Sequence, residues 1–170
     1  MGTWDIGPFD NDTAADFGGD LDEAAVEERE SMVRRVLKRA ADPADFLDVS
    51  DGERAVAAAA LVVAQHPDGE PACSNYGPSK PLPELPANLR TLAVDALDQV
   101  VADLSELAEL WGEAANGSNW LQCQGTVRSP RWRTVDIPAV GHQRSPGGQC
   151  LSPLSWVSSG ERHRVRWWPR

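Results

Sequence analysis

This sequence has no long hydrophobic run. Its longest strongly apolar stretch, AVAAAALVVA, covers only residues 55–64, about half of what a helix needs to cross a bilayer. The opening MGTWDIGPFD has no basic region followed by an apolar one, which argues against a secretory signal. We therefore expect a cytoplasmic protein without a membrane partner.

Residues suited to catalysis are also scarce. The first 116 residues contain one histidine, one cysteine and one tyrosine, a poor set for acid–base or nucleophilic chemistry. The three cysteines of the chain are too far apart for a CxxC metal site or a disulfide framework. No GxSxG, HExxH, P-loop or Rossmann motif occurs. These absences predict no catalytic residue and no cofactor.

Charge divides the chain into two parts. Residues 1–116 hold 24 acidic and 8 basic residues, whereas residues 117–170 hold 2 acidic residues and 8 arginines. The composition therefore predicts an acidic domain at 1–116 and a tail rich in Arg, Trp, Pro, Gly and Ser at 117–170.

Within the acidic part, apolar residues recur at helical spacing, and helix start signals separate the repeats. A capping box, SDGE, begins at Ser50, and the apolar run that follows indicates the most buried helix. Gly18 and Gly19 are expected to end the first helix. These patterns predict an all-α fold, a small bundle of four to five helices at about residues 12–18, 22–41, 50–65, 88–102 and 104–115.

No sustained helical period continues after Asn116, so we expect an irregular, disordered tail. Three interpretations compete. RSPRWR and RHRVRWWPR are typical of nucleic-acid contact through phosphates and stacking, and the same Arg and Trp residues suit a membrane surface. A frameshift in high-GC coding DNA gives the same composition, and we favour it.

The segment WDIGPFDND opens the acidic part, and its main residues are Trp4, Gly7, Pro8, Phe9, Asp10, Asn11 and Asp12. We interpret it as a clasp in which the aromatic residues anchor the chain and Gly-Pro turns it. The side chain of Asp10 or Asp12 then caps the first helix. The competing interpretation is a metal site made of the carboxylates of Asp10, Asp12 and Asp16.

The opening MGTWDIGPFDNDTAADFGGDLDE and the later ADLSELAELWGEA resemble the bacterial domain-of-unknown-function 4259 family over roughly residues 1–116. The family's opening signature is WGxGPFDNDxAxD-like, so this chain departs from it at Asp5 and Ile6. The resemblance implies a small helical domain and no established reaction. Family members usually stop soon after the Trp-containing helix, which favours the frameshift interpretation of the tail.

Two functions follow from these observations. The favoured one is an interaction module that docks on a basic protein partner, as an immunity or antitoxin-like protein would dock on a basic nuclease. The alternative is a metal-dependent enzyme that uses the N-terminal Asp cluster. Nucleic acid is not expected as a partner, and the tail is the only part of the chain with features that suit it.

Overall fold

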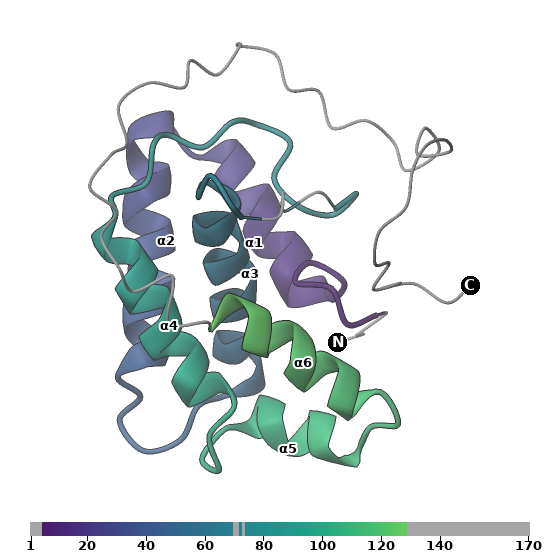
Figure 1. Cartoon of the computed structure of the whole chain (residues 1–170). Coiled ribbons are helices and arrows are strands. Elements are labelled where there is room, and N and C mark those ends of the chain that lie inside the picture. The colour runs from purple at the N-terminus through teal and green to yellow at the C-terminus, as the bar shows by residue number, and fades with distance from the viewer. Residues whose placement is uncertain (1–4, 70–71, 73, 129–170) are drawn as a thin grey trace. The chain divides into compact units, whose positions relative to one another are not determined.

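The computed structural model describes residues 5–69, 72 and 74–128, and in this part of the chain it contains helices and no strand (Figure 1). The helices are α1 (Asp12–Glu23), α2 (Val26–Ala41), α3 (Val49–Ala64), α4 (Asn88–Val100), α5 (Glu106–Glu113) and α6 (Gly117–Val127). The predicted all-α class is confirmed. Trp4 and the tail beyond residue 128 lie outside the described residues.

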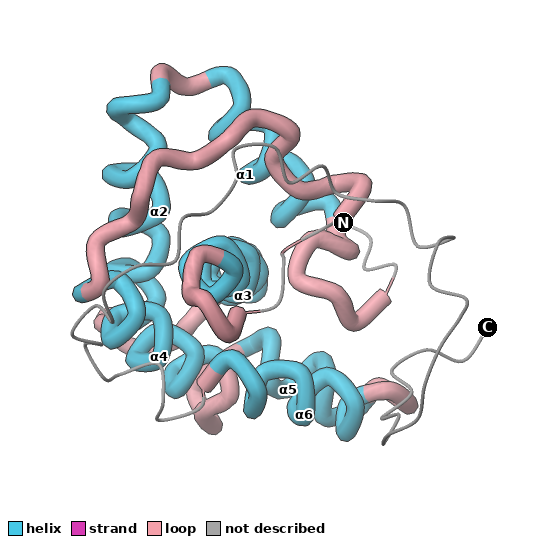
Figure 2. Tube along the Cα trace, turned by 45° about the horizontal axis from the view of Figure 1, so that its top comes forward, coloured by secondary structure: helices cyan, strands magenta, loops and turns pink. Residues whose placement is uncertain are grey.

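Helix α3 is the centre of the bundle. It contacts α1, α2, α4, α5 and α6, and Figure 2 shows it end-on with these helices around it. Four of its alanines, at positions 55, 57, 58 and 59, are completely buried. Small side chains on all sides let neighbouring helices approach closely, which confirms the prediction that this is the most buried helix.

Helix α1 is longer than predicted. Gly18 and Gly19 do not end it, and it continues to Glu23, so α2 begins at Val26 rather than near residue 22. Gly18 serves a close approach instead: a Cβ there would lie 3.0 Å from the carbonyl oxygen of Tyr76. The connection between α3 and α4 crosses α1 at this point.

That connection is attached to α1 and α2 by polar contacts. The Asp22 carboxylate accepts hydrogen bonds from the backbone N–H of Ser79 (2.8 Å), its hydroxyl (2.6 Å) and the backbone N–H of Lys80 (2.8 Å). The buried Arg29 donates to the carbonyl oxygens of Ala24 and Pro81. These bonds position a proline-rich stretch that has no regular structure of its own.

The starts of α3 and α5 are coupled. Helix α3 begins at Val49, whose N–H donates to the Glu106 carboxylate (2.8 Å), so a side chain from another helix supports the end where a local Ser50 cap was predicted. Helix α5 has its own cap, because the Ser105 hydroxyl accepts from the N–H of Ala108 (3.4 Å). Leu47 and Ser105 form an isolated parallel bridge beside these starts.

Helix α6 corrects the predicted boundary at residue 116. Gly117–Val127 is helical and packs on α3 and α5, with Trp120 and Gln124 only 3% exposed. Arg128 then pairs with Asp98 of α4 (2.7 Å). The chain is therefore part of the bundle through residue 128.

Candidate functional site

The N-terminal motif forms a tight turn that leads into α1. The Asp10 N–H donates to the Gly7 carbonyl oxygen (3.1 Å), which closes a four-residue turn with Pro8 at its second position. A Cβ on Gly7 would lie only 2.2 Å from the Asp10 carboxylate, so a larger residue there would require the Asp10 side chain to move. Phe9 is completely buried and packs against the backbone of Gly77.

Asn11, and not Asp10 or Asp12, caps the first helix. Its side-chain oxygen accepts from the N–H of Ala14 (2.8 Å), and the residue is extended and 7% exposed. Asp12 is the first residue of α1, where its charge complements the helix dipole. The predicted cap by a carboxylate is wrong by one position, because the side chain that accepts from the N–H of Ala14 belongs to residue 11.

The Asp10 carboxyl turns back on its own loop. Burial raises its pKa above the ordinary value, the nearby charge of Asp5 raises it further, and a hydrogen bond from the Gly7 backbone partly offsets both. Asp5 is exposed, and its side chain accepts from the N–H of Ile6 (2.8 Å). This bond ties the Asp5 side chain to the backbone of its own loop.

The structure does not bring the candidate metal ligands together. Asp10 and Asp12 are partly buried and Asp16 is exposed on α1. Among the described residues, no group of three or more His, Cys, Asp or Glu side chains is arranged to hold a metal ion. The geometry therefore offers no support for a metal centre on Asp10, Asp12 and Asp16.

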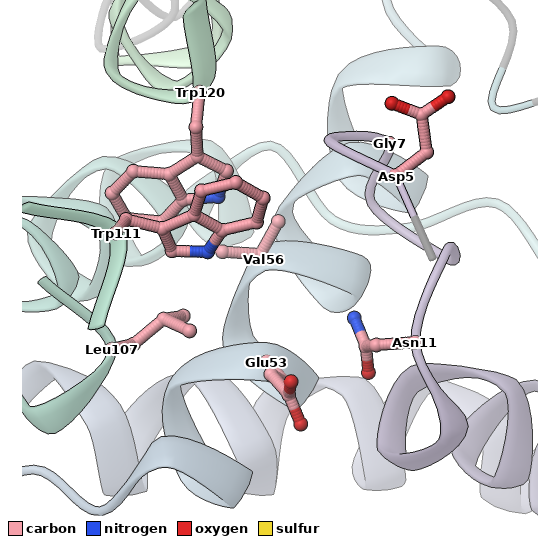
Figure 3. Close-up of a pocket in the computed structure, with 8 residues that line it drawn as sticks. All are labelled: Asp5, Gly7, Asn11, Glu53, Val56, Leu107, Trp111 and Trp120. Carbon is pink, nitrogen blue, oxygen red and sulfur yellow. The ribbon is translucent and has the colours of Figure 1, made fainter. Parts of the chain in front are cut away.

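A small pocket lies where the motif meets the rest of the bundle (Figure 3). Its lining comes from three parts of the chain: Asp5, Gly7 and Asn11 of the motif, Glu53 and Val56 of α3, and Leu107, Trp111 and Trp120 of α5 and α6. In Figure 3 the two indoles lie on one side and the motif lies opposite them. The cavity of about 10 Å³ is large enough for one water molecule.

The indoles of Trp111 and Trp120 form the aromatic wall of this pocket. Their rings are stacked, with centroids 5.4 Å apart and planes 7° apart, an arrangement that adds to the gain from burial alone. The Asp5 carboxylate points away from the indoles (Figure 3). The pocket lies at the junction of the motif with α3, α5 and α6, and its lining includes two acidic residues, Asp5 and Glu53.

Sequence reasoning missed Glu53 and Trp120 as parts of this site. Glu53 was interpreted as half of a capping box, yet it is 6% exposed and lines the pocket. Trp120 was assigned to the irregular tail. The signal that identifies α6 is helical spacing of its buried residues, Gly117, Trp120 and Gln124. This pattern covers only about two helical turns.

One comparison with known proteins identifies a family. No curated protein and no solved structure matches the chain. A family model described as "Domain of unknown function (DUF4259)" matches residues 2–123, from the N-terminal motif into α6. The match includes both sides of the pocket and most of the chain, and the protein therefore belongs to the DUF4259 family.

Proposed function

We propose that this domain is a protein-interaction module that docks on a basic partner through its acidic surface. The observation that carries the proposal is the distribution of charge along the helices. Residues 5–28 contain nine acidic and no basic residues, and residues 91–127 contain six acidic and no basic residues. Fields of one sign accelerate the encounter with an oppositely charged protein and select among partners.

Several basic residues of the domain are occupied internally. Arg34 pairs with Glu30, Arg39 with Asp51, and Arg128 with Asp98. Arg29 is buried and bonded to backbone carbonyls. These contacts compensate part of the domain's positive charge locally. No Lys or Arg lies within residues 5–28 or 91–127, so both stretches keep a net negative charge.

The alternative, a metal-dependent enzyme, has no observation in its favour. The three aspartates that it needs do not form a ligand group in the described structure. The pocket beside the motif has room for one water molecule and none for a substrate. An immunity or antitoxin-like protein, which blocks a basic enzyme by binding it, is the form of interaction module that this surface suits. Within the described residues, no helix has the length and apolarity that crossing a membrane requires.

The test is capture of partners from the native host with the full chain, followed by binding kinetics with the purified partner. We expect a basic protein whose association rate falls about tenfold or more between low and physiological salt. Neutralising Asp20 and Glu109 (Asp20→Asn, Glu109→Gln), one from each base-free stretch, should slow association more than neutralising Asp68 and Glu84 in the α3–α4 connection. A partner set without basic proteins, or rates indifferent to salt, contradicts the proposal.

A further inference from the structure

Large apolar side chains are exposed at one end of the bundle. Among the described residues, the exposed large apolar side chains are Val26, Phe46, Tyr76, Leu104, Leu110 and Leu121. Leu104 is the most exposed at 64%, Leu110 is 52% exposed and Phe46 is 44% exposed. Phe46 and Leu104 belong to the α2–α3 and α4–α5 loops, which Figure 1 shows at the same end of the bundle, beside α5.

The bridge between these loops places Phe46 and Leu104 side by side. The N–H of Leu47 donates to the Leu104 carbonyl oxygen (2.9 Å), and the N–H of Glu106 donates to the Leu47 carbonyl oxygen (3.0 Å). Leu47 and Ser105, the bridged residues, are 2% and 0% exposed. Phe46 and Leu104 are 44% and 64% exposed, so both side chains face the solvent beside this buried bridge.

Leu110 extends the same surface along α5. Glu106 reaches the N–H of Val49, so this side of α5 faces the start of α3, next to Phe46. Leu110 lies four residues after Glu106 and therefore on the same side of the helix. We name Phe46, Leu104 and Leu110 the loop-end patch.

Acidic residues flank the residues of the loop-end patch in the sequence. Asp45, Asp48, Asp103 and Glu109 are all exposed and are its neighbours in sequence. The chain has no Lys or Arg between Arg39 and Arg54 or between Arg90 and Arg128. The last turn of α2 carries two bases, Lys38 and Arg39, and Arg39 is bonded to Asp51. An apolar centre with a charged, solvated rim is the usual anatomy of a protein interface.

We infer that the loop-end patch docks a basic amphipathic segment of a partner protein, with the partner's apolar side chains on Phe46, Leu104 and Leu110 and its Lys or Arg side chains on the acidic rim. The inference rests on the proposed function and specifies where on the domain the partner binds. A second copy of this chain would set one acidic rim against another, which is unfavourable. Nucleic acid and anionic lipid are repelled by the same rim.

The test uses two synthetic helical peptides, one of Leu and Lys in amphipathic order and one with Ser in place of each Leu. Each is titrated into the isotopically labelled full chain while amide shifts are followed by NMR and affinity is measured by fluorescence anisotropy. We expect the Leu/Lys peptide to bind about tenfold or more tightly than the Ser/Lys peptide. The amide shifts should cluster at residues 42–48 and 103–110.

Variants then separate the loop-end patch from general charge. Phe46→Ser with Leu104→Ser should weaken the Leu/Lys peptide about tenfold, whereas the matched control Val26→Ser with Tyr76→Ser should leave its affinity within about twofold. Circular dichroism checks that each variant is folded. Equal loss in both variants, or shifts spread along α1, overturns the inference.

Three further outcomes are informative. If both peptides bind with equal affinity and salt releases both, the inferred docking at the loop-end patch is wrong. The proposed acidic interaction module then still stands. If light scattering shows a dimer that the Phe46→Ser, Leu104→Ser variant dissociates, the occupant is a second copy and the inference is overturned. If neither peptide binds at any salt concentration, the inference fails, and the capture experiment decides the proposed function separately.

Discussion

Asn11 holds the junction between the N-terminal turn and the bundle. Its side chain caps α1 while its neighbour Phe9 is completely buried. Asn11→Ala should lower the free energy of unfolding by about 0.5–2 kcal/mol, because a helix N–H loses its acceptor. Urea unfolding followed by circular dichroism measures the change.

The matched control is Asp16→Ala, which removes an exposed carboxylate from the same helix. Its effect should stay within about 0.5 kcal/mol. A larger loss in Asp16→Ala than in Asn11→Ala would contradict the assignment of the cap.

The ionisation of the Asp22 carboxyl makes the free energy of unfolding depend on pH. Burial acts to raise the pKa of its carboxyl, but hydrogen bonds from Ser79 and Lys80 and the charge of Lys80 outweigh burial and hold the pKa below its ordinary value. The folded state therefore releases this proton more readily than the unfolded chain, so the carboxylate stabilises the protein above its ordinary pKa. This contribution is lost as pH falls through the depressed pKa.

Asp22→Asn should therefore lower the free energy of unfolding at neutral pH and cost progressively less below about pH 4. Unfolding curves measured at several pH values test the prediction, with Asp20→Asn, an exposed neighbour on α1, as the control. A cost that is the same at pH 7 and pH 3 would mean that the hydrogen-bond geometry, and not the charge, matters.

At the scale of elements, the Trp111–Trp120 stack attaches α6 to the bundle. Trp120 is 3% exposed and contributes to the main core. Trp120→Ala should lower the free energy of unfolding by about 3–5 kcal/mol, the usual cost of deleting a buried indole. Leu121→Ala, at a neighbouring position that is 48% exposed, should change it by less than about 0.5 kcal/mol. Comparable losses in the two variants would contradict this packing.

The sequence predicts the elements before residue 116 well and α6 poorly, for a physical reason. The earlier helices repeat apolar residues over several turns, and their caps are local signals. Helix α6 has no side-chain cap, contains Gly117 and Gly125, and buries few positions, so its stability comes from α3 and α5 rather than from its own pattern. The sequence predicts too early an end for α1. Gly18 lies where the α3–α4 connection passes close to α1, and no local sequence rule describes such a contact.

The motif could be located from the sequence, but the pocket could not. Turn chemistry alone indicates a tight turn at Gly7-Pro8. Val56, Trp111 and Trp120 come from helices that follow 45 or more residues after Asn11, and only the tertiary fold places them together. The shift of the cap to Asn11 depends on one rotation of the backbone, which composition does not determine.

At the scale of the whole molecule, the described part of the bundle reaches residue 128. A chain ending after Arg128 should unfold at the same urea concentration as the bundle in the full chain. A chain ending after Asn116 loses Trp120 and the Arg128–Asp98 ion pair, so its free energy of unfolding should fall by at least about 3 kcal/mol. Equal midpoints for the two truncations would show that α6 does not support the fold.

The extent of the helical bundle, which includes α6, also changes where a frameshift would lie in the gene. The family match reaches residue 123 and α6 reaches Val127, so residues 117–127 have the character of the domain and not of foreign sequence. We propose that any change of reading frame lies after codon 128 and not near codon 117. Sequencing the gene checks this: a frame that continues the family's ending from before codon 117 would contradict it.

The central position of α3 has a consequence for synthesis on the ribosome. Its flanks are covered by α1, which is translated before it, and by α6, which is translated some 50 residues after it. The nascent chain therefore exposes one side of its most apolar helix until the last helix emerges. The contacts of α3 with α1, α2 and α4 can form earlier, but this last side of α3 is covered only after α6 has been translated.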